Sequence, residues 1–81
     1  MATLNTPEQN GRLILEIFVV HFKTRPNEVL RANNFMAMMA KLNLRAEDLN
    51  NGLEFAAENE WVEVLENGTS YRLTEAGFAQ A

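Results

Sequence analysis

Cysteine is absent from this 81-residue chain, and histidine and serine each occur once, as His21 and Ser70. Nucleophilic catalysis needs an activatable nucleophile beside a base, and a structural zinc site needs clustered cysteine and histidine. The four glycines are isolated from one another, so the sequence has no glycine-rich phosphate-binding loop. The acidic residues do not follow the spacing of a calcium-binding loop. We therefore expect that the protein is not an enzyme and that it uses no cofactor, metal ion or small-molecule ligand.

Long apolar runs are also missing. The longest nearly unbroken one, residues 13–22, is interrupted by Glu16 and His21 and is much too short to cross a bilayer. Residues 1–5 lack the charged start and the apolar run of a secretory signal peptide. Hydrophobic residues make up 47% of the chain and charged residues 22%, which is typical of a folded globular protein. Since there is no cysteine for disulfides, we expect one cytoplasmic domain, residues 1–81, that contacts no membrane.

Basic residues are scarce in the second half of the chain. Residues 46–81 carry eight acidic side chains and one basic one, whereas residues 1–45 carry six basic side chains and three acidic ones. The halves therefore differ in sign, although the whole chain has a net charge of −4. This asymmetry indicates one surface that attracts anions and another that repels them, unless the charges only solvate the surface.

The sequence predicts a first helix that begins at Pro7. Thr6 and Gln9 have the spacing of a capping box, with Thr6 as the N-cap and proline at the first helical position. Apolar residues then recur at spacings of three and four, as on the core face of a helix: Leu13, Ile14, Ile17, Phe18, Val20 and His21. Because Pro26 disfavours a helical residue before it, the helix should end near Thr24.

A short strand and a second helix follow. Residues 28–31 have β-branched character and no helical pattern, and Asn33 or Asn34 can cap the next helix. The core face of that helix consists of Phe35, Met38, Met39 and Leu42. Methionine also lines adaptable binding surfaces, but here it is expected to fill the core. We expect the same core packing for Phe18, Phe22 and Phe35.

A third helix covers about residues 46–59. Its buried stripe is Leu49, Leu53 and Ala56 or Ala57. Gly52 in its middle costs about 1 kcal/mol relative to alanine, and we interpret this glycine as a site of close approach to a neighbouring helix. The connection at residues 43–45 is short, so the second and third helices form a helix-turn-helix.

The last third of the chain predicts a β-hairpin. Two runs rich in β-forming residues, at 61–65 and 71–73, flank Asn67-Gly68. This dipeptide favours a type I′ turn, because both central residues of that turn need positive φ. Thr74 can then cap a short final helix.

The string Asn-Glu-Trp-Val-Glu-Val at residues 59–64, followed after the turn by Tyr-Arg-Leu-Thr-Glu-Ala-Gly at 71–77, resembles the end of a winged helix-turn-helix domain. The resemblance implies an α+β fold with three bundled helices and a hairpin wing. Most relatives of this type bind DNA with the third helix in the major groove, and others bind proteins. Relatives usually have glycine before the aromatic residue, where this chain has Glu60. We expect Asn59 to take the left-handed conformation instead.

The third helix lacks the basic residues expected of a helix that binds in the major groove of DNA. Its outward face, at helical spacing, is Glu47, Asn51, Glu54 and Glu58. DNA affinity depends largely on Lys and Arg at the phosphates, and this face has neither. The wing tip at residues 66–69 lacks basic residues as well. DNA binding through the third helix is therefore disfavoured.

Two hypotheses remain. The first is a non-catalytic binding module with a regulatory or accessory role, which contacts a protein partner or a second copy of itself. Its contact face would be Glu47, Asn51, Glu54, Phe55 and Glu58, with Phe55 as an exposed apolar anchor and Trp61 or Phe22 as other anchors. The alternative is a small DNA-binding regulator that uses a different, basic face, formed by Lys23, Arg25, Arg31, Arg45 and Arg72.

Overall fold

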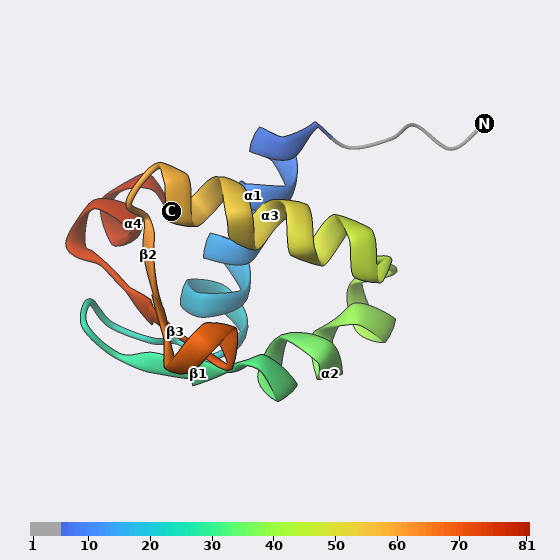
Figure 1. Cartoon of the computed structure of the whole chain (residues 1–81), viewed down its shortest axis with the longest axis horizontal. Helices are drawn as coiled ribbons and strands as arrows, with labels where there is room; N and C mark the ends of the chain where they lie inside the picture. The colour runs from blue at the N-terminus through green and yellow to red at the C-terminus, as the bar shows by residue number, and fades with distance from the viewer. Residues whose placement is uncertain (1–5) are drawn as a thin grey trace.

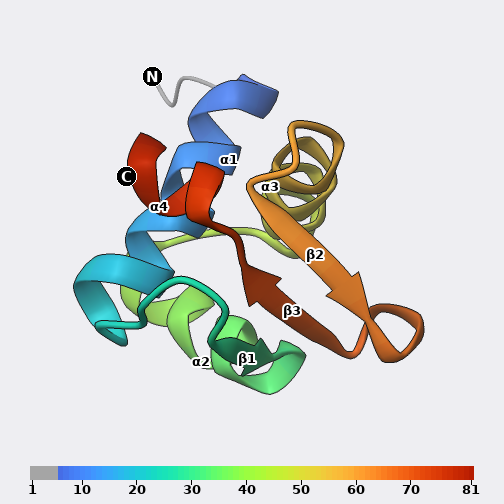
Figure 2. The ribbon, with the colours of Figure 1, turned by 90° about the vertical axis from the view of Figure 1, so that its left-hand side faces the viewer.

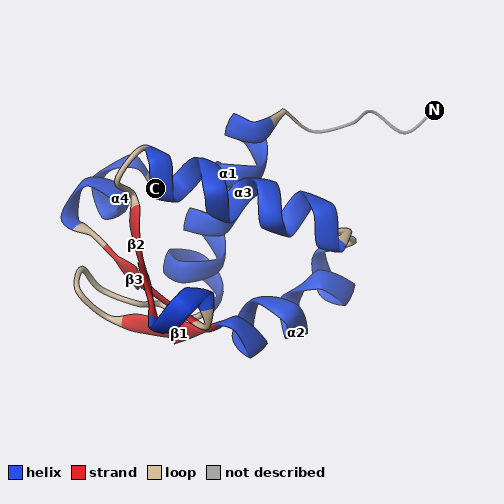
Figure 3. Cartoon of the chain, viewed as in Figure 1, coloured by secondary structure: helices blue, strands red, loops and turns tan. Residues whose placement is uncertain are grey.

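The computed structural model describes residues 6–81, so the prediction that residues 1–5 form no signal peptide lies outside the described part of the chain. The described residues form an α+β fold of four α-helices, a π-helical turn, a 3₁₀ turn and three strands (Figures 1 and 3). In chain order they are α1 (Pro7–Glu16), η1 (Ile17–His21), β1 (Val29–Arg31), α2 (Ala32–Leu42), α3 (Ala46–Glu58), β2 (Val62–Leu65), η2 (Glu66–Gly68), β3 (Ser70–Leu73) and α4 (Glu75–Gln80). The α+β class and the predicted order of elements are confirmed.

The capping box at the start of α1 is present as predicted. The Gln9 backbone N–H donates to the Thr6 hydroxyl at 3.1 Å, and the Thr6 backbone N–H donates to the Gln9 side-chain oxygen at 2.8 Å. These bonds satisfy two groups that a helix start otherwise leaves without partners, and a cap of this kind stabilises a helix by about 1 kcal/mol.

The end of the first helix differs from the prediction. Residues 17–21 form a π-helical turn, and the Phe22 N–H donates to the Ile17 carbonyl at 3.1 Å. The wider turn rotates the following side chains away from the core. Val20 is therefore 57% exposed and Phe22 37% exposed, so placing them in the core was wrong. The helix also ends at His21, before the predicted end near Thr24, whose hydroxyl and N–H both donate to the Phe18 carbonyl at 2.7 and 2.8 Å.

The second and third helices keep their predicted core faces. In α2, Phe35 and Met38 are buried and Met39 and Leu42 partly so, although the helix begins after Arg31 rather than after an asparagine. In α3 the buried stripe is Leu49, Leu53 and Ala56. The predicted close approach at Gly52 is confirmed, because a Cβ there would lie 2.5 Å from the Asn10 carbonyl oxygen of α1.

The three strands form an antiparallel sheet in the order β1-β3-β2. The predicted turn is confirmed: Asn67 and Gly68 have φ of 57° and 89°, and the Thr69 N–H donates to the Glu66 carbonyl at 3.2 Å. The β2–β3 hairpin projects away from the helices toward its tip (Figure 2). One face of the sheet packs on the helices through Leu30, Val62 and Leu73, and the other face carries Val29, Glu63 and Arg72 in one row.

A single cluster of buried side chains joins the helices to the sheet. Its largest fully buried members are Phe18 of η1 and Phe35 of α2, whose rings meet edge-on at 5.3 Å between centroids. Phe35 also meets Tyr71 of β3 edge-on at 5.6 Å. Because α1 and η1 contribute most of the fully buried aliphatic residues, the first helix is the centre of the core.

Residues 59–64 and 71–77, which carry the resemblance to winged-helix domains, meet where α3, β2 and α4 come together. We call this meeting point the joint, and two of its residues, Thr74 and Gly77, have specific roles there. The Thr74 hydroxyl accepts from the Gly77 N–H at 3.0 Å, which caps α4, and donates to the Glu60 carbonyl at 2.6 Å. A Cβ at Gly77 would lie 2.1 Å from the Trp61 carbonyl oxygen. The left-handed residue of the joint is Glu60 itself, with φ of 59°, so the prediction for Asn59 was wrong.

Candidate functional site

The outward face of α3 is exposed along its length. Glu47, Asn51, Glu54 and Glu58, which we call the acidic face, recur at spacings of four, three and four, and all four are exposed. The helix contains no basic residue, and its buried stripe lies on the opposite side. The predicted acidic surface is therefore present as a continuous strip on one element.

Phe55 lies beside the acidic face and is half-buried rather than exposed. Its ring packs edge-on against Trp61 with the centroids 5.4 Å apart, and a Cβ on Gly11 of α1 would come within 2.7 Å of the ring. A hollow of about 210 Å³ remains at its outer side, lined by Pro7, Asn51, Glu54, Phe55 and Glu58. The expectation of a freely exposed aromatic anchor was wrong. Phe55 instead forms one wall of this hollow, which we call the acidic hollow.

Trp61 is not available as a contact residue. It is buried, and the Arg12 guanidinium lies over its ring at 5.3 Å from the centroid. Arg12 is held there by Glu8 at 3.4 Å and by the Gln80 carbonyl at 3.3 Å, so α1 and α4 together keep the guanidinium over the indole. The proposal of Trp61 as an anchor was therefore wrong.

The five basic residues of the alternative hypothesis come from separate segments. Lys23 and Arg25 lie in the loop between η1 and β1, Arg31 ends β1, Arg45 precedes α3 and Arg72 lies in β3. The loop at residues 22–28 and the connection between α2 and α3 lie at opposite sides along the long axis of the molecule (Figure 1). These five residues therefore do not form one patch.

Two of these basic side chains are paired with carboxylates. Arg45 contacts Asp48 through Nε at 3.3 Å, and Arg72 pairs with Glu63 on the neighbouring strand. The hydrogen bond from Arg45 lowers the pKa of Asp48, and the same bond raises the pKa of Arg45. Each pair reduces the positive charge that these arginines can offer to phosphates.

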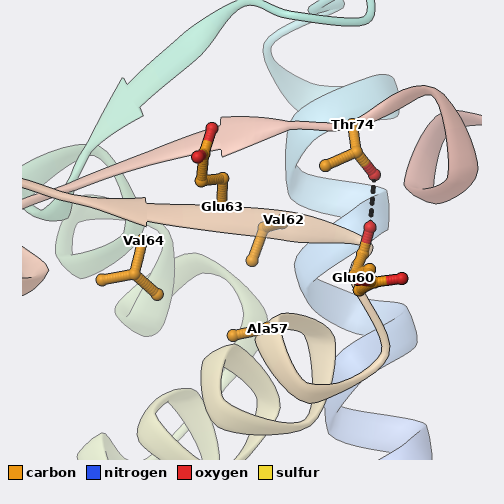
Figure 4. A pocket seen from close by; sticks show the side chains of 6 residues that line it. All are labelled: Ala57, Glu60, Val62, Glu63, Val64 and Thr74. Atoms are coloured by element: carbon orange, nitrogen blue, oxygen red, sulfur yellow. Dashed lines mark hydrogen bonds between the residues drawn. The ribbon is translucent and has the colours of Figure 1, made fainter.

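A groove that the sequence did not indicate runs between α3 and β2. One hollow of about 440 Å³ is lined by Ala57, Glu60, Val62, Glu63, Val64 and Thr74 (Figure 4). A second hollow of about 380 Å³ is lined by Asn50, Leu53, Glu54, Ala57, Glu58, Val64 and Tyr71. Because both hollows share Ala57 and Val64, we treat them as one feature, the α3–β2 groove.

The groove exists because the hairpin leaves the helices toward its tip. Val62 and Val64 point toward Ala57 of α3, whereas Glu63 points to the other side of the sheet (Figure 4). Val62 is buried, but Val64 is 47% exposed. Because alternate residues of a strand point to the same face, the sequence indicates that Val62 and Val64 share one face of the sheet. The side chain opposite them on α3 is the small Ala57, which is the one sequence feature that indicates a space there.

No three histidine, aspartate or glutamate side chains among residues 6–81 lie close enough together to hold a metal ion. Within the same residues, no helix combines the length and apolar character needed to span a membrane. In comparisons with models of protein families, with curated proteins and with solved structures, nothing matched this chain.

Proposed function

We propose that the chain is a non-catalytic binding module of the winged-helix type, which contacts a basic protein partner through the acidic face of α3 and serves a regulatory or accessory role. The order helix, strand, helix, helix, hairpin and the sheet order β1-β3-β2 support the winged-helix assignment. The joint that Thr74 and Gly77 make with β2 accounts for the string that carries the family resemblance.

The observation that carries the proposal is the exposure of the whole acidic face beside the acidic hollow. Carboxylates at Glu47, Glu54 and Glu58 attract lysine and arginine side chains, which steers encounter and fixes the register of a complex. An apolar side chain placed in the acidic hollow against Phe55 would supply affinity, since interface energy concentrates in a few buried anchors.

The same face argues against reading DNA with α3, because its carboxylates repel phosphates. The basic residues give the DNA alternative little support, since Arg45 and Arg72 are paired with carboxylates. Three basic residues of the alternative hypothesis remain exposed: Lys23, Arg25 and Arg31. The experiment below distinguishes DNA binding through these residues from protein binding through the acidic face.

The test compares two double variants of equal charge. Glu54→Gln/Glu58→Gln neutralises the acidic face, and Glu16→Gln/Glu75→Gln neutralises two exposed carboxylates of α1 and α4. The probe is a labelled helical peptide with lysines around a central leucine, titrated by fluorescence anisotropy. We expect the first variant to bind about fivefold more weakly and the second to bind like wild type, because an exposed charge pair contributes roughly 0.2–1 kcal/mol.

Two results would contradict the proposal. One is equal binding by both variants. The other is salt-sensitive binding of mixed-sequence duplex DNA that is lost on Arg25→Ala/Arg31→Ala, which would establish the DNA alternative instead. A sedimentation measurement on the chain alone decides whether the basic partner is a second copy.

A further inference from the structure

Within residues 6–81, β2 is an outer strand of the sheet, with β3 on one side and an open edge on the other. The Thr74 N–H donates to the Trp61 carbonyl at 3.0 Å, and hydrogen-bonded and non-hydrogen-bonded pairs alternate along an antiparallel ladder. Val62 and Val64 therefore occupy the non-hydrogen-bonded positions. Their backbone N–H and C=O groups point away from β3, toward the open edge.

This open edge borders the α3–β2 groove. The exposed side chain of Val64 and the side chain of Ala57 give the groove an apolar floor, which continues to the buried Val62. A strand that presents unpaired backbone groups beside an apolar floor is a template for a further strand. Such addition combines backbone hydrogen bonds, which give affinity, with alternating side-chain contacts, which give specificity.

The charge around the edge determines what can occupy it. Four acidic residues line the groove or border its edge: Glu54 and Glu58 of α3, Glu60 in the turn before β2, and Glu63 of β2, whose side chain points to the other face of the sheet. Among these four, the one carboxylate paired with a basic side chain of the described residues is that of Glu63, with Arg72. A second copy of β2 laid along this edge would bring the same carboxylates against one another, which is destabilising. The occupant that this edge favours is therefore basic and is not another β2.

We propose that an extended, basic segment of a partner protein adds to the open edge of β2 as a further strand of the sheet. Residues of the segment that face α3 are apolar and fill the α3–β2 groove over Val64. Residues that face the other way are lysine or arginine and lie beside Glu63, with Glu60 at the end of the strand. This inference rests on the proposed function in that the partner is a basic protein, and it adds a second contact, made by an extended segment of that partner at the edge of β2.

The decisive comparison uses two matched edge positions. Val64 of β2 and Val29 of β1 are 47% and 46% exposed, and both occupy non-hydrogen-bonded positions on outer strands. Val64→Pro removes an outward N–H at the proposed edge, and Val29→Pro does the same at the opposite edge. With a labelled peptide of alternating lysine and valine, we expect Val64→Pro to bind about tenfold more weakly and Val29→Pro to bind like wild type.

Hydrogen exchange on the wild-type protein provides a measurement that does not depend on how a variant folds. Addition of the Lys-Val peptide should slow exchange of the Val62 and Val64 amides and leave that of Val29 unchanged. A peptide of alternating glutamate and valine should have no effect.

Failure of this inference is distinguishable from failure of the proposed function. If binding of the helical peptide requires Glu54 and Glu58 but the Lys-Val peptide slows exchange of neither valine amide, binding through the acidic face is supported and strand addition is wrong. Equal weakening by Val64→Pro and Val29→Pro, or equal binding of the glutamate peptide, also overturns strand addition. A further result would be that Val64→Pro alone weakens binding of the Lys-Val peptide while Glu54→Gln/Glu58→Gln leaves binding of the helical peptide unchanged. That result would support strand addition at β2 and contradict binding through the acidic face.

Discussion

At single positions the missing side chain of a glycine decides how closely two elements approach. Gly52 of α3 lies against the backbone of α1, and Gly11 of α1 lies against the ring of Phe55. The two helices therefore cross at short range with a glycine on each side. The buried Asn10 side chain lies at the same crossing, where its Oδ1 has no hydrogen-bond partner within the described residues. This crossing fixes α3 and, with it, the position of the acidic face.

Gly52→Ala tests this crossing. Alanine normally stabilises the interior of a helix relative to glycine by about 1 kcal/mol. Here the added Cβ would lie 2.5 Å from a backbone carbonyl oxygen that cannot rotate away, so we expect a net loss of about 1–3 kcal/mol in the free energy of unfolding. Urea denaturation measures it. Asn51→Ala, at the exposed neighbouring position, should be neutral or slightly stabilising, and a Gly52→Ala variant as stable as wild type would contradict the packing.

A second prediction at this scale concerns Asp48, whose pKa is lowered by the hydrogen bond from Arg45. A carboxyl with a lowered pKa in the folded state stabilises the fold above its ordinary pKa of about 3.9, and that contribution is lost as pH falls through the lowered value. Asp48→Asn should therefore lower the urea midpoint at neutral pH and leave it unchanged in strong acid. Since the Arg45 side chain is exposed to water, the effect should be small. An Asp48→Asn effect of the same size at both pH values would disprove the coupling.

At the scale of elements, the Thr74 hydroxyl connects β3, α4 and the turn before β2. Thr74 follows β3, caps α4 through the Gly77 N–H and donates to the Glu60 carbonyl before β2. Thr74→Ala should lower the free energy of unfolding by about 1–2 kcal/mol, the sum expected for a cap and a partly buried hydrogen bond. Thr74→Ser should restore most of it. The control is Thr69→Ala, whose exposed hydroxyl donates to the Glu66 carbonyl within its own turn. Thermal unfolding followed by circular dichroism compares the three variants.

Local signals predicted the start of α1, the core faces of α2 and α3 and the hairpin turn, because a capping box, a helical stripe and an Asn-Gly turn act over a few residues. The π-helical turn was not predictable, since the apolar run through residues 17–22 offers no sign of the extra residue in the turn. The left-handed Glu60 was missed for a related reason. Asparagine at position 59 has the better intrinsic preference, but the Trp61 N–H must return to the Ala56 carbonyl, which requires the turn one residue later.

The candidate site was predictable only in part. Helical spacing alone identified the acidic face, because exposure on an amphipathic helix follows from its buried stripe. The half-burial of Phe55 depends on Gly11, far away in the sequence. The α3–β2 groove depends on the angle at which the hairpin leaves the helices (Figure 2), which no local pattern specifies.

For the whole molecule, stability depends on one small core in which Phe35 touches both the first helix and the sheet. Phe35→Ala should cost about 3–5 kcal/mol, which is a large share of the 5–15 kcal/mol that stabilises most domains. Phe78→Ala, at a partly exposed position of α4, should cost less than about 1 kcal/mol. Chemical denaturation measures both, and a Phe35→Ala variant that lost no more stability than Phe78→Ala would contradict the central place of this ring.

The single tryptophan of the chain gives the molecule a built-in optical label. Trp61 precedes β2 directly, and its ring lies between the Arg12 guanidinium and Phe55. Phe55, which contacts the indole, forms a wall of the acidic hollow, and Trp61 directly precedes the strand that carries the open edge, so the indole lies one contact or one residue away from each surface at which a partner is proposed to bind. Its emission depends on the groups packed around the ring, so a partner that moves Phe55 or the start of β2 can be detected in the unmodified protein, without an attached dye.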